Sequence, residues 1–411
     1  MTSKFKLLLV SMFLALLFMP RPSSAATAPP EETGLYLYIG LPDLPKFDPH
    51  FCEALSKDFV DGALVDAYWN EIESKPGVYD WTILDRWVQR VVTLHKRLSI
   101  AVLAGLYTPK WLYSPPYSVP ENDFDYNRSS VGVSYIRMAQ PTFWSPAYLR
   151  EYGKTMDALA RHLHEMQIPG QPPDAAWQAL RIVKISGVNN TTEEIRVDNT
   201  KPDNGPCHQS DAAAIWAKAG YTPNKAVSAL LTIADETAHA FPGKLMSVAI
   251  IHRNAFPPVD NAGHIVAPIV PDAATTGFLN AAVPKYRARL LVQWNALWNG
   301  WAPKELVAAG KSGARIGFQM NGFMGAWGGS GYIYPHWKIE ACKTPADFQY
   351  LLDNGLNMGA HYIEVHFASV DNPNWAPAFH EAHARMWGFE PGNNASPKPA
   401  AADLSPAKAR N

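Results

Sequence analysis

GALVDAYWNEIESKPGVYDW, residues 62–81, runs from a strand-like apolar segment through a polar turn towards a helix. Its first seven residues have the composition of a buried strand. Pro76 and Gly77 mark a turn, and residues 82–96, TILDRWVQRVVTLHK, carry apolar side chains at helical spacing. The stretch therefore predicts a unit of strand, turn and helix.

The same alternation of strand and helix recurs along the chain. The eight expected strands begin near residues 34, 62, 98, 180, 245, 290, 314 and 360, and further helices are expected over 144–165, 225–241, 278–287, 303–309, 346–356 and 376–387. Strands that alternate with helices form parallel sheets, and eight such units close into a barrel. The predicted fold is α/β, a single (β/α)8 TIM barrel.

Composition is compatible with one large domain of this kind. Of the 411 residues, 47% are hydrophobic and 18% charged, which is enough apolar material for a large core. A net charge of −1 gives no indication of a nucleic-acid or anionic-membrane partner. The chain is rich in aromatic residues, with 14 Trp, 17 Tyr and 17 Phe, and aromatic faces stack on sugar rings as readily as they fill cores.

The two ends of the chain differ in composition from the residues between them. Lys4 and Lys6 precede the apolar run 7–19, and small residues follow up to Ala25, so residues 1–25 are expected to be a secretory signal. The protein is then expected to be soluble, without a membrane partner after cleavage, and secreted or periplasmic. Residues 26–390 are assigned to the barrel, and the Ala- and Pro-rich residues 391–411 to a disordered tail.

The cysteines indicate neither a metal site nor a cofactor. Cys52, Cys207 and Cys342 are an odd number, far apart, with no C-x-x-C or other metal-ligand spacing. One disulfide is possible, and the sequence does not choose it. We expect no cofactor, and the oligomeric state is left open.

Residues 62–81 also resemble a known family. They are similar to the second strand and loop of glycoside hydrolases of clan A, especially the family 42 β-galactosidases, which carry W-x-x-I-E-x-x-x-G-x-Y-D-W there. The matching residues are Trp69, Ile72, Glu73, Gly77, Tyr79, Asp80 and Trp81. After the third strand, YTPKWLY, which contains Trp111, resembles the T-P-x-W-L of the same family. The resemblance implies a (β/α)8 barrel that acts on an oligo- or polysaccharide.

Polar residues recur on one face late in the expected strands, where catalysis gathers in this architecture. They come in pairs two residues apart: Asp66 and Tyr68, His252 and Asn254, Gln293 and Asn295, Gln319 and Asn321, and Glu364 and His366. Such a ring is costly to desolvate unless something hydrogen-bonds it, and sugar hydroxyls would do so. The alternative is that these groups and ordered water satisfy one another.

Other residues are expected to line a carbohydrate cleft at the same end of the barrel. Trp69, Trp111 and Trp327 fall on or near the C-terminal loops and are candidates for stacking on sugar rings, although packing between helix and loop is the alternative for each. Asn190 is a further candidate ligand. The long segment 113–142 is expected to add a wall.

Glycosidic hydrolysis requires two carboxyl groups, one to protonate the leaving oxygen and one to attack or to activate water. The first candidate is Glu193 in ISGVNNTTEEIRV, because the resemblance implies an acid/base glutamate after the fourth strand, usually directly after an asparagine. Here three residues separate Asn189 from Glu193. Glu193 is favoured over Glu194, and two solvated loop glutamates are the alternative.

The second carboxyl has three explanations, because the resemblance implies a glutamate at the end of the seventh strand, where Gln319 stands. Glu364 is favoured, since a charge within an apolar strand is expensive; its alternative role is a buried structural partner for a nearby Arg or His. Glu340 is the next candidate, with a helix cap as its alternative. In the third explanation the protein hydrolyses nothing and is a carbohydrate-binding barrel. Asp66 is a further carboxyl group in this region, and the role favoured for it is that of a ligand to a sugar hydroxyl and not that of the second catalytic acid.

Overall fold

The structure is a computed structural model that describes residues 30, 32–39, 48–128, 133–199, 201, 210–252, 254–269, 271–297, 302–320, 332–333, 340–342 and 344–388. The expected signal segment, 1–25, and the expected tail, 391–411, lie outside these ranges. The described residues from 32 to 388 belong to one compact unit. Across the described ranges, no helix combines the length and the apolar character needed to cross a bilayer.

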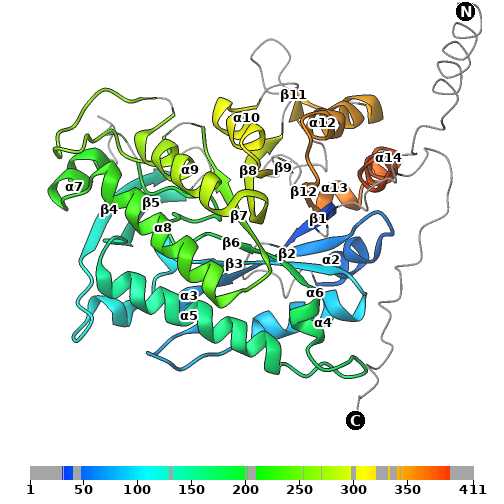
Figure 1. The fold of residues 1–411 in the computed structure, drawn as a ribbon, viewed down its shortest axis with the longest axis horizontal. Helices are drawn as coiled ribbons and strands as arrows, with labels where there is room; N and C mark the ends of the chain where they lie inside the picture. Colours follow the sequence, from blue (N-terminus) through cyan, green and yellow to red (C-terminus); the bar gives the residue numbers. More distant parts are fainter. Residues whose placement is uncertain are drawn as a thin grey trace, which may run out of the picture. The chain divides into compact units, whose positions relative to one another are not determined.

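Eight parallel strands close into a barrel, and they follow the order of the chain (Figure 1). They are β1 (Gly34–Ile39), β2 (Gly62–Tyr68), β3 (Arg97–Leu103), β6 (Leu180–Lys184), β7 (Leu245–Ile250), β8 (Leu290–Leu297), β9 (Arg315–Met320) and β12 (Tyr362–His366). The last strand pairs with the first, with Gly34 opposite Tyr362. The predicted (β/α)8 barrel is therefore confirmed, including all eight strands.

Helices cover the outside of the barrel. The longer ones are α2 (Asp48–Ser56), α4 (Thr82–Thr93), α5 (Pro146–Glu165), α8 (Pro223–Ala240), α9 (Ala273–Tyr286), α10 (Lys304–Lys311), α12 (Pro345–Asn357) and α14 (Ala376–Trp387). Shorter ones are α3 (Trp69–Ile72), α6 (Ala175–Ala179), α7 (Ala212–Lys218) and α13 (Phe367–Val370). Every helix expected from periodicity is present within a few residues of its predicted bounds.

Local signals explain where several helices begin. Thr222 caps α8 by accepting a hydrogen bond from the backbone of Lys225, and Thr344 forms a reciprocal capping box with Asp347 at the start of α12. Each of these two helices also has proline in its first turn, where the missing N–H is not needed. The capping residues and the helical periodicity therefore indicate the same starting points for α8 and α12.

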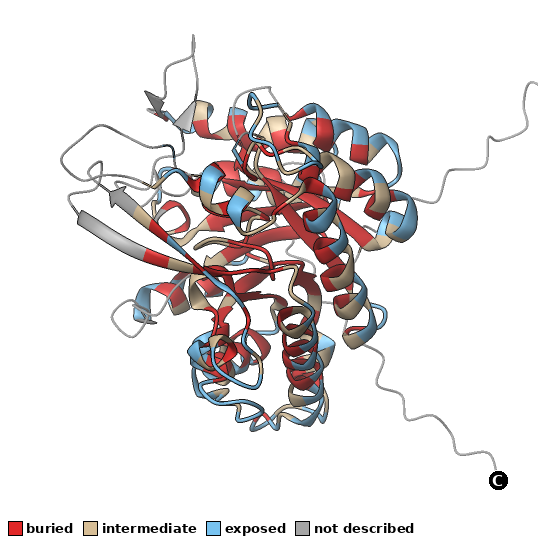
Figure 2. Cartoon of the chain, turned by 90° about the vertical axis from the view of Figure 1, so that its left-hand side faces the viewer, coloured by how far each residue is buried: buried red, intermediate tan, exposed pale blue. Residues whose placement is uncertain are grey.

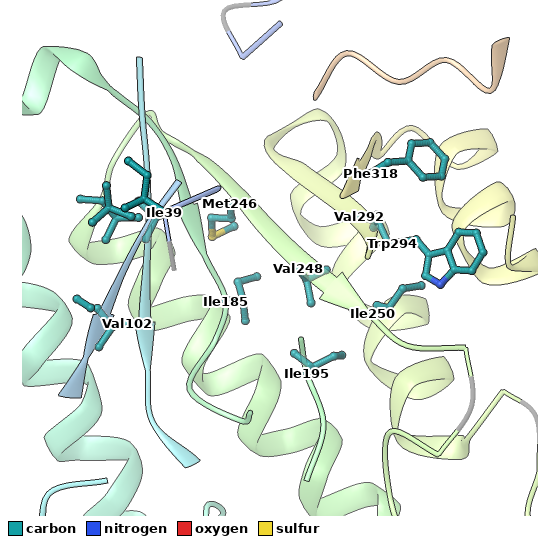
Figure 3. Packing of buried hydrophobic residues seen from close by; sticks show 14 of the residues in the cluster. Ile39, Val102, Ile185, Ile195, Met246, Val248, Ile250, Val292, Trp294 and Phe318 are labelled. Carbon is teal, nitrogen blue, oxygen red and sulfur yellow. The ribbon is translucent and has the colours of Figure 1, made fainter. Parts of the chain in front are cut away.

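The strands alternate between two cores. Met246, Val248 and Ile250 of β7, with Val292 and Trp294 of β8, belong to the apolar layer between the barrel and the helices (Figure 3). Alternate residues pack inside the barrel, where Tyr36, Ile182, Leu245, Leu291 and Tyr362 form a separate apolar cluster. Figure 2 shows the burial of the strands within the partly exposed helices. The inward-facing residues at the C-terminal ends of the strands therefore determine which side chains lie at that opening of the barrel.

The segment 113–142 is not a plain loop as expected. After a short 3-10 turn it forms an antiparallel hairpin of β4 (Glu121–Arg128) and β5 (Val133–Pro141). The amide of Asn122 donates to the carbonyl of Gln140 and to Thr142 Oγ1, which closes the base of the hairpin. Cross-strand pairing, which a search for barrel strands does not test, explains the difference.

The motif in residues 69–81 has a structural role. Glu73 is buried and accepts hydrogen bonds from Trp69 Nε1 at 2.8 Å, Thr155 Oγ1 at 2.7 Å and the backbone N–H of Gly77 at 2.8 Å. Its carbonyl also accepts from Trp111 Nε1 at 3.0 Å. These bonds tie the loop after β2 to α5 and to the segment after β3.

Trp69 lies in the core and not in a cleft. Its side chain is fully buried, with ring edges against Trp111, Tyr148 and Tyr152. A ring without an exposed face cannot stack on a sugar, so the expected stacking role does not fit Trp69. Trp111 is partly buried, and its ring contacts Tyr117 and Trp69.

Candidate active site

Glu364 stands at the centre of a polar network inside the barrel. Its Oε1 accepts hydrogen bonds from Lys184 Nζ and Tyr362 OH, each at 2.5 Å. Its Oε2 accepts from Gln293 Nε2 at 2.7 Å and Gln319 Nε2 at 2.8 Å. Four strands thus supply donors to one carboxylate, whose lone pairs are all used.

The network is fully enclosed. Glu364, Lys184 and Gln293 have no exposed surface, and Lys184 also donates to Gln293 Oε1 at 2.7 Å. A buried ion pair compensates its desolvation only when such additional hydrogen bonds are present, and removing one partner alone costs about 3–5 kcal/mol. The alternative predicted for Glu364, a buried structural partner, therefore describes part of its role, but the expected Arg or His was wrong, because the partner is Lys184.

Glu193 joins this network from the loop after β6. Its side chain is 1% exposed, so the alternative of a solvated loop glutamate is wrong for this residue. Its Oε1 accepts from Asn295 Nδ2 at 2.5 Å and from Gln319 Nε2 at 2.7 Å. Gln319 thus donates one amide proton to each of the two carboxyl groups.

The surroundings of Glu193 favour its protonated form. Burial raises the pKa of Glu193 well above its ordinary value, and the negative charges of Glu194, Asp66 and Glu364 raise it further, while Lys184 acts in the opposite direction. A carboxyl group whose pKa is raised in this way is suited to act as a proton donor.

Backbone contacts fix the loop that carries Glu193. The backbone N–H of Ile195 donates to the carbonyl of Ala249 at 2.9 Å, and the Ile195 side chain packs beside Val248 and Ile250 (Figure 3). Glu194, the next residue, is only partly buried and accepts from Thr192 Oγ1 within the loop. Glu193 and Glu194 therefore occupy different environments.

Asn189 and Gly105 bring a second loop against the same site. Asn189 Oδ1 accepts from the backbone N–H of Ala104 at 3.0 Å. Gly105 has φ +49°, and a Cβ there would lie 2.0 Å from the carbonyl oxygen of Asn189. Only glycine permits this close approach. Asn190, a predicted sugar ligand, is partly buried in the same loop.

Asp66, Tyr38 and His366 form a second polar group. Tyr38 OH donates to Asp66 Oδ2 at 3.0 Å, and the rings of Tyr38 and His366 are 5.2 Å apart. Burial raises the pKa of Asp66 to about 7, although Tyr38 and Lys184 oppose the shift, and burial lowers the pKa of His366 to about 4. Among the described residues, Asp66 Oδ1 and His366 Nε2 have no hydrogen-bond partner.

Other predicted site residues lie elsewhere. His252 Nδ1 is 3.6 Å from Glu305 Oε2 of α10, on the helix side of the barrel, and Asn254 is exposed with φ +58°. Both follow the end of β7, where the alternation of a strand no longer applies. Placing these two residues in the polar ring of the mouth was therefore wrong.

Of the remaining predicted residues, only some lie within the described ranges. Tyr68 is buried, with its ring 4.0 Å from Tyr107. Asn321 and Trp327 lie outside the described residues, as does the side chain of Glu340, whose backbone pairs with Ile333 in a two-stranded ribbon of β10 (Tyr332–Ile333) and β11 (Glu340–Ala341).

Three site residues were missed in the sequence, namely Lys184, Tyr38 and Tyr362. Lys184 had a usable signal, because a lysine within LRIVKISG is as unexpected in an apolar strand as Glu364. Within the described ranges, no three His, Cys, Asp or Glu side chains gather as metal ligands. Cys52 and Cys342 are not joined by a disulfide, and Cys207 lies outside those ranges.

Comparisons with known proteins identify the fold. No protein-family model matches the sequence, and no curated protein matches it. The catalytic domain of a β-amylase from Paenibacillus polymyxa superimposes with a TM-score of 0.55 at 11% identity, over 88% of this chain and 100% of that domain. The likeness establishes a shared (β/α)8 fold, as the sequence resemblance implied.

Two β-galactosidases are more distant in structure. The family 42 enzyme from G. stearothermophilus gives a TM-score of 0.48 at 11% identity, covering 88% of this chain and 57% of that one. The enzyme from Bacillus circulans sp. alkalophilus gives 0.49 at 10% identity, covering 86% and 56%. This chain therefore spans little more than half the length of either galactosidase.

Proposed function

We propose that this protein is a glycoside hydrolase that cleaves a glycosidic bond in an oligo- or polysaccharide, with Glu193 as general acid and Glu364 as its partner. The observation that carries the proposal is the amide of Gln319, which donates to both carboxyl groups. Two acids joined in this way at the C-terminal end of a (β/α)8 barrel have the arrangement that glycosidic hydrolysis needs.

The separation of the acids favours retention of configuration. Gln319 Nε2 is 2.7 Å from Glu193 Oε1 and 2.8 Å from Glu364 Oε2, and these two oxygens cannot be farther apart than the sum of those distances. That limit lies at the upper end of the roughly 5–5.5 Å of retaining enzymes and below the roughly 6.5–9.5 Å of inverting ones.

In this mechanism Glu364 Oε2 attacks the anomeric carbon while the proton of Glu193 passes to the leaving oxygen. The resulting glycosyl ester is then hydrolysed by a water that gives its proton to Glu193. The attack requires Oε2 to release its hydrogen bonds from Gln293 and Gln319, whereas Lys184 and Tyr362 hold Oε1. Lys184 thus orients the nucleophile.

Sugar hydroxyls are proposed to contact the polar residues near the two acids. Asp66 Oδ1 and His366 Nε2 are buried atoms without a partner among the described residues, and a hydroxyl group that donates to one and accepts from the other would satisfy both. Tyr68, Asn190, Gln293, Asn295 and Gln319 are further candidates from the same end of the barrel.

A non-catalytic carbohydrate-binding barrel is the second candidate, and one observation favours it. Glu364 already accepts four hydrogen bonds, and an amide, Gln319, stands where the resemblance implies the nucleophile. In that case the two acids and Gln319 would form a fixed polar floor beneath a bound sugar.

We also propose that residues 1–25 direct export and that the protein is secreted or periplasmic. The support is the order of basic, apolar and small residues in that segment. N-terminal sequencing of the mature protein after expression with its full leader is the test. A retained Met1 in the soluble fraction would contradict it.

Turnover on a panel of oligo- and polysaccharides tests the hydrolase. For a substrate that turns over, Glu193→Gln is expected to lower kcat/KM by about 10²–10⁴-fold on natural glycosides, and far less on a dinitrophenyl glycoside, whose leaving group needs no proton in the first step. Glu194→Gln is the matched control, with little change expected. Binding without turnover anywhere on the panel would overturn the hydrolase in favour of the binding barrel.

A further inference from the structure

Two buried atoms beside the candidate active site, Asp66 Oδ1 and His366 Nε2, have no hydrogen-bond partner among the described residues. Both side chains lie against Tyr38, whose OH donates to Asp66 Oδ2 at 3.0 Å and whose ring centre is 5.2 Å from that of His366. Asp66 stands near the end of β2 and His366 ends β12, and these two strands flank β1. One small group of a bound sugar can therefore contact both atoms.

His366 presents an acceptor at this place. Its imidazole donates a hydrogen bond to the backbone of Met320, and because Nε2 has no partner in the described ranges, the donor is Nδ1. Nε2 then carries a lone pair and no proton. Burial lowers the pKa of His366 to about 4, so the ring is neutral near pH 7.

Asp66 presents a second acceptor when it is ionised. Burial raises its pKa to about 7, against the opposing effects of Tyr38 and Lys184, and the negative charges of Glu364 and Glu194 raise it further. A positive charge bound at Oδ1 would stabilise the carboxylate and lower this pKa. The position therefore favours a cationic ligand.

The described part of the chain does not supply that cation. Asp66 Oδ2 has the hydroxyl of Tyr38 as its partner, and Oδ1 has none. Lys184 donates its Nζ to Glu364 Oε1 and Gln293 Oε1 instead. A counter-charge for Asp66 would have to come with the ligand.

The neighbouring wall is aromatic. Tyr68 follows Asp66 by two residues on β2, so the two side chains share a face of the strand. The ring of Tyr68 lies 4.0 Å from that of Tyr107, and both rings pack with Tyr38 against one small apolar cluster. This part of the wall adds no positive charge that would repel a cationic ligand.

An ammonium group matches the two acceptors better than a hydroxyl group does. It has three protons to donate and no lone pair, so it can donate to Asp66 Oδ1 and to His366 Nε2 at once. A hydroxyl group has one proton and bonds to both atoms only while Asp66 is itself protonated. Hydrogen bonds from a cation to a carboxylate are also about twice as strong as neutral ones.

We propose that the sugar unit bound beside Asp66 and His366 carries a free amino group, so that the substrate is an oligo- or polysaccharide that contains an amino sugar. This inference rests on the proposed function, which places a substrate sugar next to these two side chains. An N-acetylated sugar does not meet the same requirement, because its amide has one proton and no positive charge.

Binding of matched sugars to the full chain tests the proposal. Glucosamine is compared with glucose, and galactosamine with galactose, by ligand-observed NMR titration at pH 7 and constant ionic strength. In at least one pair the amino sugar is expected to bind about tenfold or more tightly, which corresponds to one charge-assisted contact. Equal affinities within both pairs, or no binding by either amino sugar, would overturn the proposal.

Two variants locate the preference. Asp66→Asn removes the negative charge at nearly constant size, and the ratio of the two dissociation constants should fall from about tenfold to about one. His366→Phe removes the Nε2 acceptor and should also reduce the ratio, so the test does not depend on one variant folding. Because a ratio is measured, a general loss of affinity or of folded protein does not imitate the result.

Asp157→Asn is the matched control. It makes the same chemical change at an exposed position of α5. Less than about a twofold change in the ratio is expected, since exposed charges are screened by salt. An equal change in the ratio for Asp157→Asn and Asp66→Asn would show that the preference reflects overall charge, and the proposal would fail.

Turnover distinguishes a failure of this inference from a failure of the proposed hydrolysis. Hydrolysis of a neutral oligosaccharide without preference for either amino sugar would retain the hydrolase and overturn the amino-sugar substrate. A preference for an amino sugar that Asp66→Asn abolishes, without turnover of glucosamine or galactosamine oligomers, would retain the amine site and support the carbohydrate-binding barrel.

Discussion

Glu73 and Glu364 are both buried glutamates with several hydrogen bonds, but their neighbours differ. Glu73 accepts from neutral groups, those of Trp69, Thr155 and Gly77, which tie a loop to a helix. Glu364 accepts from Lys184 and shares the amide of Gln319 with a second acid, Glu193. Burial and hydrogen bonding are therefore common to both roles, and the nearby second acid is what marks the candidate active site.

The largest effect is expected from Glu364→Gln. The amide cannot attack an anomeric carbon and leaves Lys184 buried without its counter-charge, so kcat should fall by at least about 10³-fold and stability by about 3–5 kcal/mol. Turnover and urea unfolding measure the two. Lys184→Met combined with Glu364→Leu removes both charges and should recover much of the stability but no activity.

Recovery of stability without activity would separate the structural from the chemical role of Glu364. Turnover by that double variant would contradict the assignment of Glu364 as nucleophile. The proposed hydrolysis would then need another carboxyl group, and Glu340 is the remaining candidate from the sequence.

Glu73→Gln should give a smaller and different result. An amide retains acceptor capacity on one atom only, so at least one of the donors from Trp69, Thr155 and Gly77 loses its partner, at about 1–3 kcal/mol. The midpoint of urea unfolding should fall, while kcat of the folded fraction stays within about threefold. A loss of turnover at unchanged stability would mean that the motif contributes to chemistry.

Opposite pH dependences are expected from Asp66 and His366. The pKa of Asp66 is raised to about 7, so the folded state binds more protons than the unfolded one from about pH 4 to 7, and Asp66 lowers stability as pH rises through that range. The pKa of His366 is lowered to about 4, so the unfolded state binds more protons from about pH 4 to 6.5, and His366 raises stability with pH there.

Thermal unfolding of two variants between pH 4 and 7.5 separates these contributions. Asp66→Asn should make stability rise more steeply with pH than in the parent, because the opposing contribution is gone. His366→Asn should make it fall more steeply. Equal pH profiles for the parent and both variants would show that neither group titrates in this range.

Repetition explains why the fold was predictable and the details of the site were not. Each barrel strand is an apolar run flanked by a helical pattern, so all eight barrel strands were predicted. The β4–β5 hairpin lies outside that repeat and was not. Glu193 was predicted as a candidate from its place after the fourth strand, and its catalytic role is a proposal. Lys184 was not predicted because the two-acid mechanism itself requires carboxyl groups and no cation, and His252 was misplaced because the alternation of side chains ends with β7 at Ile250.

The smallest effect tests the turn that Glu73 holds. Gly77 has φ +69° with open space around the position of a Cβ, and Gly170 has φ +76° with equally open space. Alanine at either should cost about 1 kcal/mol through backbone strain alone, so Gly77→Ala and Gly170→Ala are expected to lower stability equally in urea unfolding. A much larger loss for Gly77→Ala would show that strain there also breaks the bond from its N–H to Glu73. In that case the motif stabilises more of the barrel than its own loop, and the contrast between Glu73 and Glu364 becomes one of degree.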